Sequence, residues 1–160
     1  MIDQELRTVL GEATRIVFVC SGNMVRSAFA DLYAKHIGIE REVASVATTY
    51  RNNALYPETA AALRQRGIDA GTIRSFRPTH VEDAPELFRE GTLLFAMTHS
   101  HLHALATSPA SHCPVFLFPR ILGQELEIAD PVLEGADFEV TFRTLGRCVE
   151  ALRDELQART

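Results

Sequence analysis

The feature that most constrains the fold of this chain is a short apolar segment followed by a loop that contains glycine and asparagine. Residues 16–19 are four β-branched or aromatic residues in a row, which is typical of a parallel strand buried on both of its faces. The strand runs into Cys20, and the next residues include Gly22 and Asn23, which tolerate a left-handed backbone. A helical pattern begins after Ser27. A strand, a short loop and a helix N-terminus in this order point backbone N–H groups at one place, so the segment predicts an anion-binding site.

Cys20 and Arg26 supply the reactive groups of this predicted anion site. A cysteine at a helix N-terminus beside an arginine is favoured as the thiolate, which is the nucleophilic form. The guanidinium of Arg26 keeps its charge and can donate two parallel N–H bonds to an oxyanion. A thiolate beneath a bound tetrahedral dianion is arranged for in-line attack on phosphorus.

Predicted strands and helices alternate along the chain. After the first strand, strands are expected at residues 42–47, 92–97 and 114–118, and helices at 3–11, 28–37, 57–66, 79–90, 99–107 and 138–156. This alternation predicts an α/β fold with a four-stranded parallel sheet, right-handed crossovers and helices on both faces. The chain contains no linker or repeat, so we expect a single domain over residues 1–160, with residues 1–12 as an N-terminal helical extension. Ligands of such sheets bind beyond the C-terminal strand ends, where Cys20 lies.

Composition narrows the classes of partner. A net charge of −5 disfavours binding to nucleic acid or to an anionic membrane, and no apolar run is long enough to cross a bilayer. The three cysteines are scattered and odd in number, which fits a reducing compartment, and we expect a cytoplasmic protein. His99, His101 and His103 invite a metal interpretation, but only the first and third share a helix face, so we expect solvent-exposed histidines and no metal site.

The pattern around the nucleophile is Cys-x5-Arg-Ser, formed here by Cys20, Ser21, Gly22, Asn23, Met24, Val25, Arg26 and Ser27. Together with its strand and helix flanks, this pattern resembles the phosphate-binding loop of the low-molecular-weight protein-tyrosine phosphatase family. Asp130-Pro131, ahead of the last predicted helix, resembles the Asp-Pro general acid of the same family. The resemblance covers about residues 14–157 and is specific at these two places.

The resemblance implies a phosphatase that works through a cysteinyl-phosphate, with Cys20, Arg26 and Asp130 as catalytic residues. Residues 21–27 would bind the phosphate, Ser27 would donate to the sulfur, and Asn23 would hold the left-handed loop backbone. Met24 and Tyr50 are expected at the substrate rim. The resemblance implies no cofactor, and the expected partner is a phosphorylated protein. The sequence leaves the oligomeric state open.

Several alternatives stay open at the level of the sequence. Met24 is apolar, which in the family goes with phosphotyrosine, but Pro131 is followed by no aromatic residue, so a protein-arginine phosphatase or an enzyme acting on a small phosphate ester remains an alternative. A thioredoxin-coupled arsenate reductase is a minor alternative, because Cys113 is one further cysteine where two are needed. From another class comes a catalytically silent module that binds phosphoproteins without turnover.

Overall fold

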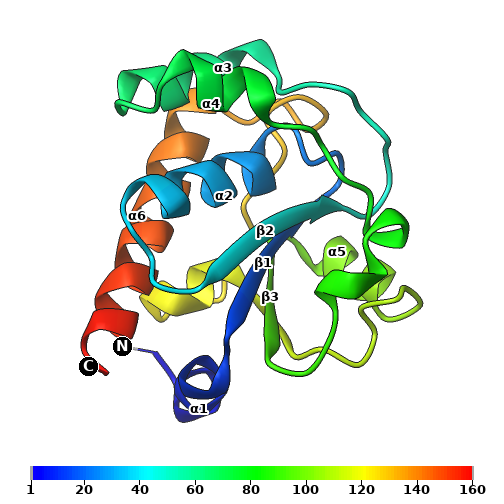
Figure 1. Cartoon of the computed structure of the whole chain (residues 1–160), viewed down its shortest axis with the longest axis vertical. Helices are drawn as coiled ribbons and strands as arrows, with labels where there is room; N and C mark the ends of the chain where they lie inside the picture. The colour runs from blue at the N-terminus through cyan, green and yellow to red at the C-terminus, as the bar shows by residue number, and fades with distance from the viewer. Residues whose placement is uncertain (1, 160) are drawn as a thin grey trace.

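The computed structural model describes residues 2–159, which form one four-stranded parallel sheet in the order β2-β1-β3-β4 with helices on both faces (Figure 1). The predicted fold class is therefore confirmed. The strands are β1 (Arg15–Cys20), β2 (Glu42–Ala47), β3 (Thr92–Ala96) and β4 (Val115–Leu117). The helices are α1 (Gln4–Glu12), α2 (Arg26–His36), α3 (Pro57–Gln65), α4 (Ala70–Ser75), α5 (His99–Leu105) and α6 (Phe138–Gln157).

Strand β1 lies at the centre of the sheet and is buried along its whole length. Its side chains alternate between two apolar layers, as the pleat of a strand requires. Ile16 and Phe18 belong to the larger layer, whereas Val17 and Val19 belong to the smaller one. Burial on both faces explains why the segment reads as a continuous apolar run.

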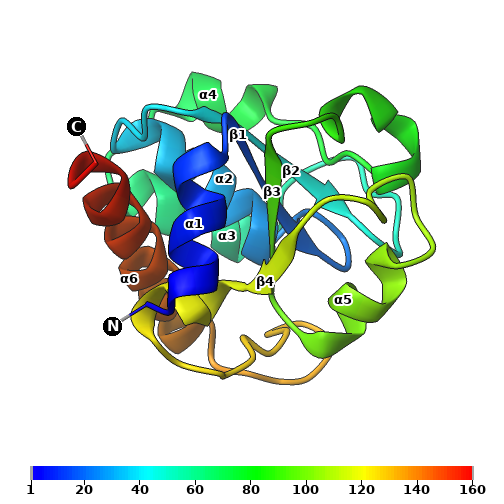
Figure 2. The same ribbon diagram turned by 90° about the horizontal axis from the view of Figure 1, so that it is seen from below.

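The two layers are covered by different helices. Helices α1, α2 and α6 pack over the larger layer, and α5 lies on the opposite side of the sheet (Figure 2). Helix α6 contributes a regular stripe of buried residues that includes Phe142, Leu145 and Val149. Leu6 and Leu10 of α1 are fully buried in the same cluster, so the predicted N-terminal extension is an integral part of the core.

Two expectations for local structure are wrong. A helix over residues 79–90 does not form, because Pro85 interrupts the segment and only two short 3-10 turns result, Val81–Asp83 and Pro85–Leu87. Gly11 does not end the first helix, which continues to Glu12. A Cβ at Gly11 would meet only the end of the exposed Arg159 side chain, at 3.0 Å, which can move aside, so packing does not explain this glycine. The sequence interpretation also missed α4, which Asp69 caps by accepting a hydrogen bond from the backbone of Thr72.

The strand order places the candidate site. From β1 the chain moves to β2 on one side and later to β3 on the other, so the connections diverge at the C-terminal end of β1. Cys20 is the last residue of β1 and pairs in register with Ala47, the last residue of β2. A point of divergence in a parallel sheet leaves a crevice for a ligand.

Candidate active site

The loop between β1 and α2 is held by hydrogen bonds from both sides. Asn23 adopts φ 53, the predicted left-handed conformation, and its side chain donates to Ser27 Oγ at 2.8 Å and accepts from the backbone N–H of Thr79 at 2.9 Å. Gly22 lies close to Asn52, because an added Cβ would be 2.8 Å from Asn52 Nδ2 and that side chain would have to shift. That same amide donates to the carbonyl of Gly22 at 3.0 Å.

The sulfur of Cys20 lies at the start of α2. Cys20 is buried, with 2% of the residue exposed. The backbone N–H of Ser27 donates to the sulfur at 3.4 Å, and Ser27 Oγ lies 3.0 Å from it. Because the amide of Asn23 already donates to Ser27 Oγ, the Ser27 hydroxyl is free to donate to the sulfur. Two hydrogen-bond donors and a helix N-terminus therefore surround the sulfur of Cys20.

Arg26 is the largest buried polar side chain near this sulfur, with 2% exposure. Its Nη1 donates to the carbonyl of Ile128 at 2.8 Å, and its Nη2 lies 3.3 Å from Asp130 Oδ2. Nη2 also reaches Ser21 Oγ at 3.5 Å. Its Nε is buried and makes no hydrogen bond within the described residues 2–159. A buried N–H without a protein acceptor is costly, so this nitrogen is suited to a bound oxyanion.

Asp130 reaches the site from the loop that precedes α6. Its Oδ1 accepts from the backbone N–H groups of Val132 and Leu133 at 2.8 and 3.3 Å, and its Oδ2 faces Arg26. The loop is attached to the sheet edge, because the N–H of Ile128 donates to the carbonyl of Met97 at 2.9 Å. The carboxyl group of Asp130 is thereby held beside the guanidinium although the two residues lie far apart in the sequence.

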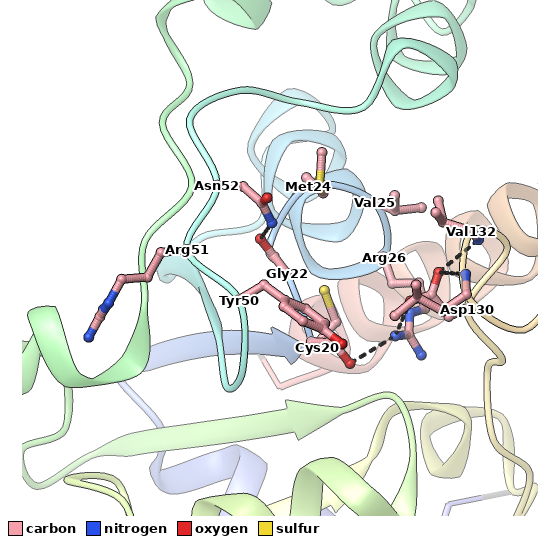
Figure 3. Close-up of a pocket in the computed structure, with 12 residues that line it drawn as sticks. Cys20, Gly22, Met24, Val25, Arg26, Tyr50, Arg51, Asn52, Asp130 and Val132 are labelled. Atoms are coloured by element: carbon pink, nitrogen blue, oxygen red, sulfur yellow. Dashed lines mark hydrogen bonds and ion pairs between the residues drawn. The ribbon is translucent and has the colours of Figure 1, made fainter.

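These groups open onto one cavity of about 370 Å³ (Figure 3). The residues that line it are Cys20, Ser21, Gly22, Met24, Val25, Arg26, Tyr50, Arg51, Asn52, Asp130, Val132 and Leu133. Of residues 21–27, Asn23 and Ser27 do not line the cavity; Asn23 holds the loop by its hydrogen bonds to Ser27 and Thr79. Arg51 points away from the other labelled groups in Figure 3 and pairs with Asp83 at 3.1 Å. The cavity thus joins the predicted nucleophile, arginine and acid, and it has a partly apolar mouth.

Tyr50, Val132 and Leu133 make that mouth exposed and apolar, with 49, 41 and 62% of their surface exposed. Tyr50 is therefore an exposed residue of the cavity lining. Tyr56, by contrast, stacks on Phe138 with ring centroids 5.7 Å apart and is not part of the cavity lining.

The expectation that all three clustered histidines are solvent-exposed is wrong for His101. His99 and His103 are exposed, but His101 is 2% exposed and its Nε2 lies 2.9 Å from Ser21 Oγ. Burial, followed by the nearby positive charge of Arg26, lowers the pKa of His101 to about 4. Helical spacing identifies the face of His101 but not its contact with a loop from another part of the chain, so the sequence carried no signal for this contact.

Within residues 2–159, no group of three or more His, Cys, Asp or Glu side chains has an arrangement that could hold a metal ion. None of the helices among the described residues is long and apolar enough to cross a membrane. Cys113 and Cys148 are free and buried, and burial raises the pKa of both thiols, that of Cys148 to about 12.

Solved structures resemble this chain over most of its length. An arginine phosphatase from Geobacillus stearothermophilus is 25% identical, with a TM-score of 0.75 over 91% of this chain and 94% of that one. A low molecular weight protein tyrosine phosphatase from T. tengcongensis is also 25% identical, with a TM-score of 0.68 over 92% of this chain and 100% of that one. The tyrosine phosphatase Wzb from Escherichia coli K30, at 20% identity and a TM-score of 0.74 over 90% of this chain and 99% of that one, shares the fold.

No curated protein sequence matches the chain significantly. The family model described as low molecular weight phosphotyrosine protein phosphatase matches residues 15–160, which covers every strand and all helices except α1. The resemblance noted at the phosphate loop is thereby confirmed. The chain belongs to the low molecular weight phosphotyrosine protein phosphatase family and is a cysteine-dependent phosphatase.

Proposed function

We propose that this phosphatase hydrolyses phosphotyrosine in proteins through a phosphate ester of Cys20. The observation that carries the proposal is that Cys20, Arg26 and Asp130 line one cavity with apolar residues at its mouth, and that the buried Nε of Arg26 has no hydrogen-bond partner among residues 2–159. An anion site alone would need neither a nucleophile nor an acid.

Binding of the phosphoryl group is assigned to the loop and to Arg26. A tetrahedral dianion beneath the N-terminus of α2 would accept hydrogen bonds from the loop N–H groups and from Nε and Nη2 of the guanidinium. Since Arg26 is 2% exposed, its attraction for the anion is weakened little by water. The same donors would stabilise the charge that spreads over the equatorial oxygens during transfer.

The reaction then has two steps. The Cys20 thiolate attacks phosphorus, the bond from phosphorus to the tyrosine oxygen breaks, and Asp130 gives its proton to the leaving phenolate. Asp130, now a carboxylate, takes a proton from water as the water oxygen attacks phosphorus. The sulfur–phosphorus bond breaks, and the thiolate and inorganic phosphate are released. Ser27, 3.0 Å from the sulfur, stabilises the thiolate as it leaves.

The carboxylate of Asp130 lies 3.3 Å from Nη2 of Arg26, so a phosphate that binds there competes with it for this nitrogen. The two negative charges of the phosphate beside Asp130 then favour the protonated carboxyl group, which is the form that an acid catalyst needs. Binding of substrate thereby prepares the acid.

The substrate class is proposed from the rim. Tyr50, Val132 and Leu133 offer apolar surface to an aromatic ring whose phosphate reaches Cys20, and aromatic rings gain free energy by such burial. A protein-arginine phosphatase is the second candidate, supported by the similarity to the Geobacillus arginine phosphatase. The apolar rim favours phosphotyrosine over the charged guanidinium of phosphoarginine.

The remaining alternatives find less support. An arsenate reductase needs a relay of thiols, but Cys113 packs in the apolar layer on the opposite face of the sheet from Cys20. A binding module without turnover does not account for an acid placed beside the nucleophile. The three free cysteines support a cytoplasmic location.

The proposal is tested with one peptide prepared in phosphotyrosine and phosphoarginine forms, by following phosphate release. We expect faster release from the phosphotyrosine form and none above background with Cys20→Ser. Faster release from the phosphoarginine form would replace the first candidate by the second. Equal rates for the wild-type protein and Cys20→Ser would contradict the covalent mechanism.

A further inference from the structure

A buried histidine that the proposed mechanism does not use lies directly behind the cavity. His101 is in the first turn of α5, and its ring fills the space between the end of β3 and the phosphate loop. Its Nδ1 lies 3.1 Å from the backbone N of Thr98 and its Nε2 lies 2.9 Å from Ser21 Oγ. Both ring nitrogens therefore have partners, and one of these partners lines the cavity.

The partner of Nδ1 determines which nitrogen carries the proton. The backbone N–H of Thr98 can only donate, so Nδ1 of His101 must be the acceptor and carry no hydrogen. Thr98 Oγ1, 3.2 Å from the same nitrogen, can donate to it as well. The proton of the neutral ring is consequently on Nε2, which donates to Ser21 Oγ. The pKa of about 4, lowered by burial and then by Arg26, agrees with a neutral ring at ordinary pH.

The hydrogen bond from His101 determines in turn what Ser21 can do. Ser21 Oγ accepts from His101 Nε2 at 2.9 Å and from Arg26 Nη2 at 3.5 Å. A hydroxyl has two acceptor positions and one hydrogen, so both acceptor positions of Ser21 are engaged. Its hydrogen is left to donate to a third group. Because Ser21 and Cys20 line the same cavity, a group bound in the cavity can accept this hydrogen.

We propose that His101 is a positioning residue that holds the hydroxyl of Ser21 as a hydrogen-bond donor to the phosphoryl group bound at Cys20. The inference rests on the proposed function for its ligand and adds a side-chain donor to the N–H groups of the loop. If the His101 proton were on Nδ1, Ser21 would donate to the ring, and the phosphate would lose this bond. The histidine thus acts on the phosphate through Ser21 and makes no contact of its own.

The test measures equilibrium binding of inorganic phosphate by calorimetry, which needs no turnover. We compare the wild-type protein with Ser21→Ala, His101→Phe and the variant that carries both changes. A hydrogen bond to a charged group corresponds to about 10- to 100-fold in affinity. Each single change is therefore expected to weaken phosphate binding about tenfold or more. The double change is expected to bind phosphate as Ser21→Ala does, because His101 has nothing to position once the hydroxyl is gone.

His103→Phe is the matched control, since it makes the same change at an exposed position of the same helix, and it is expected to bind phosphate like the wild type. Unchanged binding by His101→Phe would overturn the inference, and so would a further loss from His101→Phe in the Ser21→Ala background. If His101→Phe does not fold, His101→Leu replaces it, with the same expected loss and the same overturning results. His101→Gln keeps an N–H near the place of Nε2 and is expected to bind phosphate more tightly than the variant without this donor; binding as weak as that of Ser21→Ala would overturn the inference.

A measurement on the wild-type protein complements the comparison of the single and double variants. Imidazole nitrogen chemical shifts at neutral pH are expected to show a neutral His101 ring with its proton on Nε2. A proton on Nδ1 would overturn the inference whatever the variants do. If the wild-type protein binds phosphate but hydrolyses no aryl phosphate, the proposed function is contradicted. The phosphate affinities of the variants then still decide whether His101 positions Ser21. Absence of phosphate binding to the wild type would overturn both.

Discussion

Asp130 is expected to weaken phosphate binding and to support turnover. It weakens binding because its carboxylate pairs with Nη2 of Arg26, a donor that the phosphate also needs. Its Oδ2 lies 3.3 Å from Arg26 Nη2, and at an effective dielectric constant of about 20 two unit charges at this distance attract by about 5 kcal/mol. The hydration that both groups lose on burial offsets most of this attraction. The net contribution of a hydrogen bond between charged groups is about 1.5–3 kcal/mol. A phosphate ion must recover that amount when it displaces the carboxylate.

Asp130→Asn removes the charge and keeps an oxygen for the backbone N–H groups of Val132 and Leu133, so the loop is retained. We expect inorganic phosphate to bind about tenfold more tightly to this variant, since 1.4 kcal/mol is a factor of ten. Turnover of an unactivated aryl phosphate should fall by about 10²–10⁴ because the acid is lost, and turnover of para-nitrophenyl phosphate should fall much less.

Calorimetric titration with phosphate and initial rates on the two substrates measure these effects. Glu134→Gln is the matched control, because it removes a carboxylate from the same turn, where Glu134 bonds the backbone N of Asp130 and not Arg26. Weaker or unchanged phosphate binding by Asp130→Asn would refute the competition for Arg26. Equal losses with the two substrates would remove Asp130 from the role of acid.

Three further predictions concern the loop, the buried histidine and the first helix. Gly22→Ala should displace Asn52 and raise KM for an aryl phosphate several-fold, with no added effect in an Asn52→Ala background, because the same bond is lost. The pKa of His101 in the folded protein is about 4, below its ordinary 6.5, so the unfolded chain binds one more proton between these pH values. The free energy of unfolding should therefore fall by roughly 3 kcal/mol as the pH drops from about 6.5 to 4. Urea unfolding of His101→Phe should show a flatter pH dependence. Leu10→Ala should lower the free energy of unfolding by about 2–5 kcal/mol in urea titrations, whereas exposed Thr8→Ala should change it by less than about 0.5 kcal/mol.

Most of the fold was readable from the sequence because its elements are long and strongly patterned. The buried strand β1 and the apolar stripe of α6 lie where the apolar residues predict them. The failures occurred in short segments. Pro85 broke an expected helix, and the six-residue helix α4 was too short for its periodicity to be read.

The candidate site was likewise predictable from the sequence only in part. One strand-loop-helix segment contains Cys20, Asn23 and Arg26. Local backbone geometry brings these residues together, so the sequence was sufficient to predict that they lie close to one another. The location of Asp130 rested on a resemblance, since it comes to Arg26 from a loop 104 residues away.

The sequence by itself therefore determined the loop that carries Cys20 and the individual strand and helix on either side of it, because each of these depends on neighbours along the chain. Only the tertiary structure decided that Asp130 pairs with Arg26 and that His101, 80 residues from Ser21, donates to its hydroxyl. The physical reason is that these contacts depend on how β1, α5 and the loop before α6 meet at one sheet edge. A helical pattern records that a histidine lies on a certain face, but it carries no information about which distant side chain that face will meet.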